Sequence, residues 1–133
     1  MKKFILLFIL SQIGFSQIEG GHYISKYIEH HVLEGASYKP DPSNNAGWLD
    51  CEFFFDPKQQ YFEYACGDDD AVKIWYEYDG KEKIGGVMCD VYWDQDGDKL
   101  VIDYDNNEIG YFYNLNSANY YKNLQVWSKI EKD

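Results

Sequence analysis

Three aspartates at alternate positions are the residues of this sequence that most resemble a metal site. Asp94, Asp96 and Asp98 occur in the segment DQDGDKLVIDYD, and carboxylate oxygens are the ligands that calcium prefers. An EF-hand loop, however, needs glycine at its sixth position and glutamate at its twelfth. Counted from Asp94, these positions hold Lys99 and Asp105. The segment therefore offers a loose calcium site at Asp94, Asp96 and Asp98 as its only cofactor hypothesis, and a tight turn as the favoured interpretation.

Catalytic motifs are scarce. Asp90 faces Asp103 in the hairpin register described below, at the roughly 5 Å that suits a retaining glycosidase, but on a polar face without sign of a cleft. The adjacent His30 and His31 would point to opposite faces of a strand, so they do not favour a shared metal ion. No Ser-His-Asp order, glycine-rich phosphate loop or HExxH motif is present. The sequence does not decide whether the protein is an enzyme, and it favours a non-catalytic role.

The three cysteines permit one disulfide and leave one thiol over. Cys51 and Cys66 oppose each other in the register of the hairpin that contains them, which favours that pair. A bond between Cys66 and Cys89 is the alternative. Three reduced thiols remain a further possibility, because some exporting bacteria oxidise cysteines inefficiently.

The aromatic content is high, with 13 Tyr, 4 Trp and 8 Phe. Such residues suit a stacking surface for sugars or another flat ligand, but they also fill strand positions that favour aromatics. If they form the wall of a ligand site, the candidates are Trp75, Trp93, Tyr104, Tyr111 and Tyr113.

The segment from residue 48 to residue 66 predicts a β-hairpin. Its side chains alternate between apolar and polar, and Asp56-Pro57 begins the turn, since proline presets the backbone at the second turn position. A four-residue loop then sets Phe55 opposite Phe62. Continuing outward brings Cys51 opposite Cys66, on the same apolar face.

Two glycine-containing dipeptides shape the next segment, residues 71–94. Asp79-Gly80 suits a two-residue type I′ turn, so it is the expected hairpin turn. Gly85-Gly86 would then interrupt the second strand, most simply as a bulge or bend.

The aspartate-rich segment also fits a hairpin. With Asp96-Gly97 as a two-residue turn, Trp93 faces Leu100 and Val91 faces Ile102 on one apolar face, while Asp94 pairs with Lys99 on the other. Asn106-Asn107 can turn the chain again, which sets Tyr104 opposite Ile109 and Ile102 opposite Tyr111. The segment 124–131 alternates well enough to be a last strand.

The N-terminus predicts export. Met1-Lys2-Lys3 precedes an apolar run, and Gly14 and Ser16 are small residues at the positions that signal peptidase requires. We expect residues 1–16 to be a cleaved signal peptide and residues 17–133 to be a single domain, secreted or periplasmic. The run is shorter than the roughly 20 residues of a membrane-spanning helix, so no span is expected in the mature chain.

The charge narrows the range of partners. The formal net charge is −11, and loss of Lys2 and Lys3 with the leader would make it −13. Such a chain repels phosphate backbones, and arginine is absent, so nucleic acid is not expected as a partner.

Six to eight antiparallel strands in sequence predict an all-β fold, either a small up-and-down barrel or a compact sandwich. The barrel plan is lipocalin-like in architecture only, because the Gly-x-Trp motif is missing from the first strand. The leading function is an exported barrel whose aromatic interior holds a small apolar or sugar-like ligand. The alternative is a secreted interaction module, such as an inhibitor or surface-associated protein, whose acidic, aromatic-rich face meets a cationic protein. A pocket would favour the first; a filled core with an exposed aromatic patch would favour the second.

Overall fold

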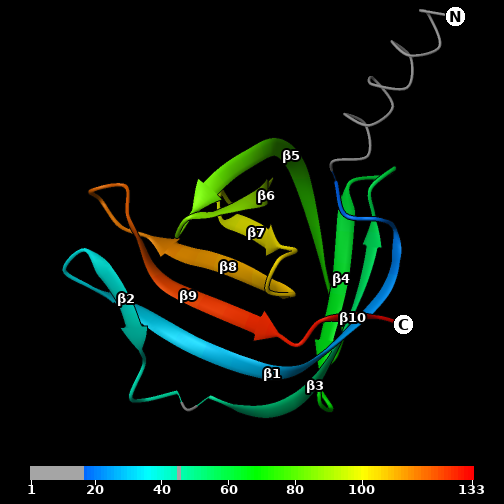
Figure 1. Cartoon of the computed structure of the whole chain (residues 1–133), viewed down its shortest axis with the longest axis horizontal. Coiled ribbons are helices and arrows are strands. Elements are labelled where there is room, and N and C mark those ends of the chain that lie inside the picture. Colours follow the sequence, from blue (N-terminus) through cyan, green and yellow to red (C-terminus); the bar gives the residue numbers. More distant parts are fainter. Residues whose placement is uncertain (1–16, 45) are drawn as a thin grey trace, which may run out of the picture.

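The chain folds into a closed antiparallel up-and-down β-barrel in the computed structural model, which describes residues 17–44 and 46–133 (Figure 1). Eight strands form the wall in the order β1-β3-β4-β5-β6-β7-β8-β9, β9 pairs with β1 to close it, and the short strands β2 and β10 also pair with β1. The strands are β1 (Gly21–Glu34), β2 (Ser37–Pro40), β3 (Gly47–Asp56), β4 (Tyr61–Cys66), β5 (Val72–Ile84), β6 (Val87–Asp94), β7 (Lys99–Asp103), β8 (Glu108–Leu115), β9 (Tyr121–Ser128) and β10 (Glu131–Lys132). The all-β prediction is confirmed as a barrel. The expected signal peptide, residues 1–16, lies outside the described residues. Among the described residues, no helix is long and apolar enough to cross a membrane.

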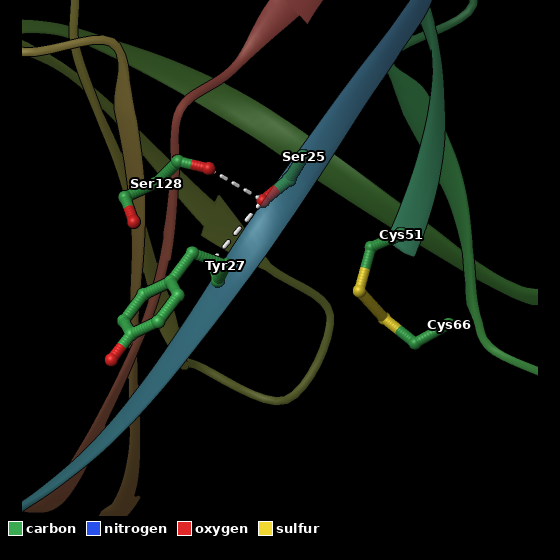
Figure 2. The surroundings of a disulfide bond; sticks show 5 residues. All are labelled: Ser25, Tyr27, Cys51, Cys66 and Ser128. Carbon is green, nitrogen blue, oxygen red and sulfur yellow. Dashed lines mark hydrogen bonds between the residues drawn. A yellow bond between two sulfur atoms is a disulfide. The ribbon is translucent and has the colours of Figure 1, made fainter. Parts of the chain in front are cut away.

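The first strand is long enough to change partners along its length. It pairs with β3 and β10 near its start and with β9 further on, and its register against β3 shifts between Ser25 and Tyr27. Ser25 is 1% exposed, and its hydroxyl lies 2.8 Å from the Ser128 carbonyl oxygen and 3.3 Å from that of Tyr27 (Figure 2). This buried hydroxyl therefore lies within hydrogen-bonding distance of carbonyl oxygens on both β1 and β9, beside the irregular register.

The hairpin of β3 and β4 has the register that its sequence predicts. Cys51 pairs with Cys66, Phe53 with Tyr64 and Phe55 with Phe62. The disulfide between Cys51 and Cys66 is present, and it closes the open end of this hairpin (Figure 2). Cys89 is buried as a free thiol. The preferred cysteine pairing is therefore confirmed, and the pairing of Cys66 with Cys89 is wrong.

The hairpin of β5 and β6 turns at a different place from the one predicted. Asp79-Gly80 is not the turn: Gly80 lies within β5 at a register shift, with φ of +89°. The chain turns instead at Gly85-Gly86, between the paired residues Ile84 and Val87. Both of these glycines have positive φ, as a type I′ turn requires at both central positions. Two glycines adopt positive φ at both turn positions with less conformational strain than Asp-Gly would. The bulge needs positive φ at one residue only, and Gly80 provides it.

The hairpin of β6 and β7 differs from the predicted register by one residue. Trp93 pairs with Lys99, and Tyr92 with Leu100. The cause is a longer turn. The Asp94 amide donates to the Asp98 carbonyl, three residues lie between them, and Gly97 has φ of +82°, as in a three-residue loop with a left-handed glycine. Because side chains alternate along a strand, this single step moves Tyr92 to the inside and Trp93 to the outside.

The hairpin of β7 and β8 differs by two residues, so its faces are kept. Ile102 pairs with Ile109 and Leu100 with Tyr111, and Tyr104 lies in the turn rather than in a strand. Asp90 pairs with Ile102 and not with Asp103, which removes the expected pair of carboxylates. The last wall strand closes against the first, as the alternation of residues 124–131 predicts.

The interior is filled by large side chains. Those exposed by less than 2% include Phe53, Phe55, Phe62, Tyr92, Leu100, Ile109 and Trp127. Ring contacts link several of them, among them Phe55 with Phe62 at 5.2 Å and Phe53 with Trp127 at 5.0 Å. Burial of so much apolar surface is the main source of stability. This part of the barrel is a packed core.

Candidate functional site

A groove lined by two tryptophans lies outside the barrel, on strands β5 and β6. It has a volume of about 460 Å³ and contains both Trp75 and Trp93. Trp75 is 45% exposed. The full lining is Gln59, Gln60, Trp75, Tyr76, Glu77, Trp93, Asp94 and Gln95. We call this the outer groove. It combines two indoles with amide and carboxylate groups.

The two indoles are held in place by neighbouring polar groups. The Trp93 Nε1–H donates to Asp79 Oδ2 at 2.9 Å, and the Lys99 ammonium lies 5.5 Å from the centre of the Trp93 ring. The Lys73 ammonium lies 4.6 Å from the centre of the Trp75 ring. The Trp75 backbone amide donates to the side-chain oxygen of Gln95 at 3.0 Å, which joins the β6–β7 turn to β5. The groove is therefore bordered by hydrogen-bonded and charged groups, and the exposed Glu77 pairs with Trp93 across β5 and β6.

The expectation that Trp75 and Trp93 line the interior is wrong. Ile74 and Tyr76 point inward on β5, so Trp75 between them points outward. Trp93 is outward because of the longer β6–β7 turn. The two indoles nevertheless come together, on the opposite face of the sheet from the predicted one.

Tyr111 and Tyr113 lie on the inner face of β8, partly exposed and stacked with ring centres 5.8 Å apart. The Tyr111 hydroxyl donates to Asp94 Oδ2 at 2.5 Å and approaches Asp98 Oδ2 at 3.3 Å. Burial, followed by the hydrogen bond to Asp94, raises the pKa of Tyr111 well above its usual range. The Tyr111 hydroxyl is therefore already engaged as a hydrogen-bond donor, and it stabilises the aspartate turn. Nothing in the structure brings Tyr111 or Tyr113 into the outer groove.

Tyr104 belongs to a separate network around a buried carboxylate. Asp90 is fully buried, and its Oδ2 accepts from the Tyr104 hydroxyl at 2.5 Å. Its Oδ1 accepts from the Tyr78 hydroxyl at 2.9 Å and from the Lys81 ammonium at 2.8 Å. Burial, with the hydrogen bond to Asp90, raises the pKa of Tyr104 far above its usual range. Three donors satisfy this carboxylate, so its role is to join β5, β6 and the β7–β8 turn.

The Asp90 network could not be found by alternation alone. The predicted register set Asp90 on the polar outer face, and only the longer β6–β7 turn brings it inside. Residues Tyr78 and Lys81 lie on either side of the β5 bulge, at the Asp79-Gly80 position where the sequence predicts a turn. The available signal was the acid itself, within a run of apolar residues.

The aspartate turn has few free oxygens for a cation. One oxygen each of Asp94, Asp96 and Asp98 lies within 4.8 Å of the others. However, Asp94 Oδ1 accepts the backbone amides of Asp96 and Asp98, each at 2.9 Å, and Oδ2 accepts from Tyr111. Burial and the neighbouring charge of Asp94 raise the pKa of Asp98. We assign the turn a structural role, and calcium binding there stays a prediction.

A second, smaller cavity lies at the end of the barrel beside the N-terminal segment. Its volume is about 220 Å³. It is lined by Ile18, Tyr23, Ile102, Asp103, Tyr104, Asn107, Glu108, Ile109, Ile130 and Lys132. Four isoleucines make it the more apolar of the two sites, and it is the better place for a small apolar molecule.

Comparison with known proteins yields no relative. No family model matches the chain, and neither the curated proteins nor the solved structures contain a match.

Proposed function

We propose that this protein binds a sugar-like ligand on the outside of its barrel, in the outer groove. The observation that carries the proposal is a groove lined by Trp75 and Trp93 together with the exposed Glu77 and three glutamines. The role is binding rather than catalysis, because Asp90 is saturated with donors and lies away from the groove lining.

The chemistry of the groove matches that of a sugar. One face of a pyranose carries C–H groups with small positive partial charges, and the face of an indole is negative. Sugar hydroxyls both donate and accept, so they suit glutamine amides, which do the same, and carboxylates, which accept. A purely apolar ligand would leave these polar groups unpaired on desolvation.

The packed interior argues against a ligand within the barrel. Phe53, Phe55 and Phe62 are each 1% exposed, and an occupant would have to displace them. A small apolar ligand is better placed in the isoleucine-lined cavity, which makes the two ligand classes separable by experiment.

The test uses the four tryptophans as internal reporters. In a two-dimensional NMR spectrum, each indole Nε1–H of a ¹⁵N-labelled sample gives one signal. A panel of neutral mono- and disaccharides at millimolar concentration should shift the signals of Trp75 and Trp93. The signals of Trp48, which is 72% exposed, and of Trp127, which is 1% exposed, should stay in place.

Trp75→Ala should weaken sugar binding at least about tenfold, while Trp48→Ala should leave it unchanged. Equal shifts at Trp48 and Trp75 would indicate non-specific contact and contradict the proposal. If instead short alcohols or benzene move only the methyl signals of Ile18, Ile102, Ile109 and Ile130, the ligand is apolar and the outer groove is not its site.

A secreted interaction module is the second candidate, favoured by the filled interior together with exposed aromatics such as Trp48 and Tyr120, the latter 63% exposed. With a net charge of −11, this module would attract a cationic partner. A lysine-rich peptide should then bind at low salt, release at high salt and be indifferent to Trp75→Ala. Sugar binding that depends on Trp75 would favour the first function.

Export is part of the proposal. A disulfide in a small domain is typical of an oxidising compartment, in agreement with the predicted leader. N-terminal sequencing of the exported protein should begin at Gln17 or its cyclised form, and a soluble product that keeps Met1 would contradict it.

A further inference from the structure

A row of aromatic rings crosses the outer face of four neighbouring strands. His22 on β1 lies 5.0 Å from Phe54 on β3, measured between ring centres. Phe54 lies 6.1 Å from Tyr61 on β4, and Tyr61 lies 5.1 Å from Trp75 on β5. We call these four residues the aromatic row. It runs across the strands and ends at the outer groove.

The rings face solvent because of the alternation of each strand. Phe53 and Phe55 point into the core on either side of Phe54, and Ile74 and Tyr76 do so on either side of Trp75. The row presents one ring on each of four strands, with successive ring centres 5.0, 6.1 and 5.1 Å apart. These spacings are comparable with the length of one sugar unit in a linear chain.

The row has a second depression at its far end. It has a volume of about 140 Å³ and lies beside His22 and Phe54. Its lining also contains Glu52, Phe53, Glu63, Tyr64, Ala65 and Ala71. Glu52 and Glu63 therefore accompany Phe54 as Glu77 accompanies the indoles. Aromatic faces with carboxylate acceptors beside them occur at both ends of the row.

We propose that the ligand of the outer groove is a linear, uncharged oligosaccharide that lies across the strands along the aromatic row, with successive sugar units over Trp75, Tyr61 and Phe54. This inference rests on the proposed function and deepens it, because it names a chain rather than a single sugar. The β-1,4-linked chain is the class that fits, since it is extended and presents C–H groups on flat faces.

The charges along the row select against acidic glycans. Glu52, Glu63 and Glu77 flank it, and the whole chain carries a net charge of −11. Lys73 is the cation in contact with the rings, with its ammonium 4.1 Å from the centre of Tyr61 and 4.6 Å from that of Trp75. An exposed cation–π contact is weak and the lysine stem is flexible, so the ammonium can move aside and donate to sugar hydroxyls.

Isothermal titration of the full mature chain with β-1,4-linked oligosaccharides of glucose, xylose and N-acetylglucosamine, from two to six units long, tests the inference. For at least one of these sugars, the dissociation constant should fall roughly tenfold between two and four units and then level off. Phe54→Ala should remove most of that gain and leave the affinity for the disaccharide unchanged. Trp75→Ala should weaken binding at every length.

The control is Tyr120→Ala, which removes an aromatic ring that is 63% exposed and lies outside the row; it should bind like the parent protein. If the disaccharide binds as tightly as the hexasaccharide and Phe54→Ala has no effect, the extended site is wrong while the proposed function stands. If no sugar of any length binds, both fail. Tighter binding of polygalacturonate than of the neutral chains would overturn the preference for an uncharged glycan.

Discussion

The inner and outer faces of the barrel wall use the same residue types for opposite purposes. Phe53 and Phe54 are neighbours in the chain, as are Tyr76 and Trp75, yet the first member of each pair is buried and the second faces solvent. Inside, rings pack edge to face or stacked against one another. Outside, rings of comparable size stand in a row with polar groups between them. Position along a strand, rather than residue type, decides whether an aromatic side chain is buried in the core or lies on the outer surface.

The matched pair Phe53→Ala and Phe54→Ala tests this contrast most strongly. Phe53 is 1% exposed and touches Phe55, Tyr64 and Trp127, so its truncation should cost about 3–5 kcal/mol of unfolding free energy. Phe54 is only partly buried, and its truncation should cost about 1 kcal/mol or less. Urea denaturation of both variants measures the difference. Similar losses would mean that the two faces are not distinct.

Removal of the inner-face disulfide should have the next largest effect. Cys51 and Cys66 are 15 residues apart, and closing a loop of that size contributes about 3 kcal/mol in the chain-entropy model. The double variant Cys51→Ala/Cys66→Ala should lose about that amount in chemical denaturation, with binding at the outer groove retained. Cys89→Ala, which leaves the bond intact, is the control. Peptide mapping that links Cys89 to either partner would contradict the register of β3 and β4.

Gly97→Val should destabilise the fold by roughly 1–3 kcal/mol, because its φ of +82° is strained for a β-branched residue. An added Cβ meets no atom within 4 Å, so backbone strain alone is measured. Gly97→Asn is the matched control and should cost much less, since asparagine tolerates this conformation. The turn sets which of Tyr92 and Trp93 faces inward, so an alternative register in Gly97→Val should expose Tyr92. Thermal melts that rank the two variants equally would argue against a left-handed Gly97.

Asp98→Asn should change the free energy of unfolding least, and it should stabilise the protein where the other variants destabilise it. The pKa of Asp98 is raised by burial and by the charge of Asp94, so its ionised form is disfavoured in the folded state. Its contribution to stability is therefore complete below the unfolded pKa of about 4 and is lost as the pH rises through the higher folded value. The variant should be more stable at neutral pH by less than about 1 kcal/mol, with no gain at low pH.

Asp96→Asn is the control, because it removes an equal charge from an exposed position of the same turn. Its gain in stability at neutral pH should be smaller than that of Asp98→Asn. Both melts should be repeated with millimolar calcium. A rise in melting temperature of the parent protein that Asp98→Asn abolishes would show that the turn binds the ion, contrary to its structural assignment.

Local features of the sequence were sufficient for the hairpin of β3 and β4, but not for the two that follow. In the hairpin of β3 and β4, the turn that Pro57 favours and the alternation of apolar and polar residues both predict the same register. In β5 and β6, two dipeptides each could turn the chain, and the choice between Asp79-Gly80 and Gly85-Gly86 depends on strand lengths around the closed barrel. In β6 and β7, two-residue and three-residue turns both satisfy the local pattern, and they differ by the one step that inverts the faces.

Local sequence features were also insufficient to predict the candidate site in full. Trp75 and Trp93 could be named as candidate ligand-binding residues from their aromatic character. The side of the wall on which Trp93 lies could not be predicted, because it depends on the β6–β7 turn. Phe54 and Tyr61 lie in the hairpin that the sequence predicts correctly. The aromatic row as a whole was not predicted, because His22 meets Phe54 and Trp75 meets Tyr61 only across strands of different hairpins.

By itself, the sequence determined the all-β class, the order of strands, the disulfide and the acidic character, since these follow from alternation, turn residues and composition within short segments. The tertiary structure alone decided the registers of the later hairpins, the buried network of Asp90 and the union of four strands into the aromatic row. The physical reason is that closing a barrel makes every register depend on all the others. A side chain faces the core or the solvent only once that whole set is satisfied.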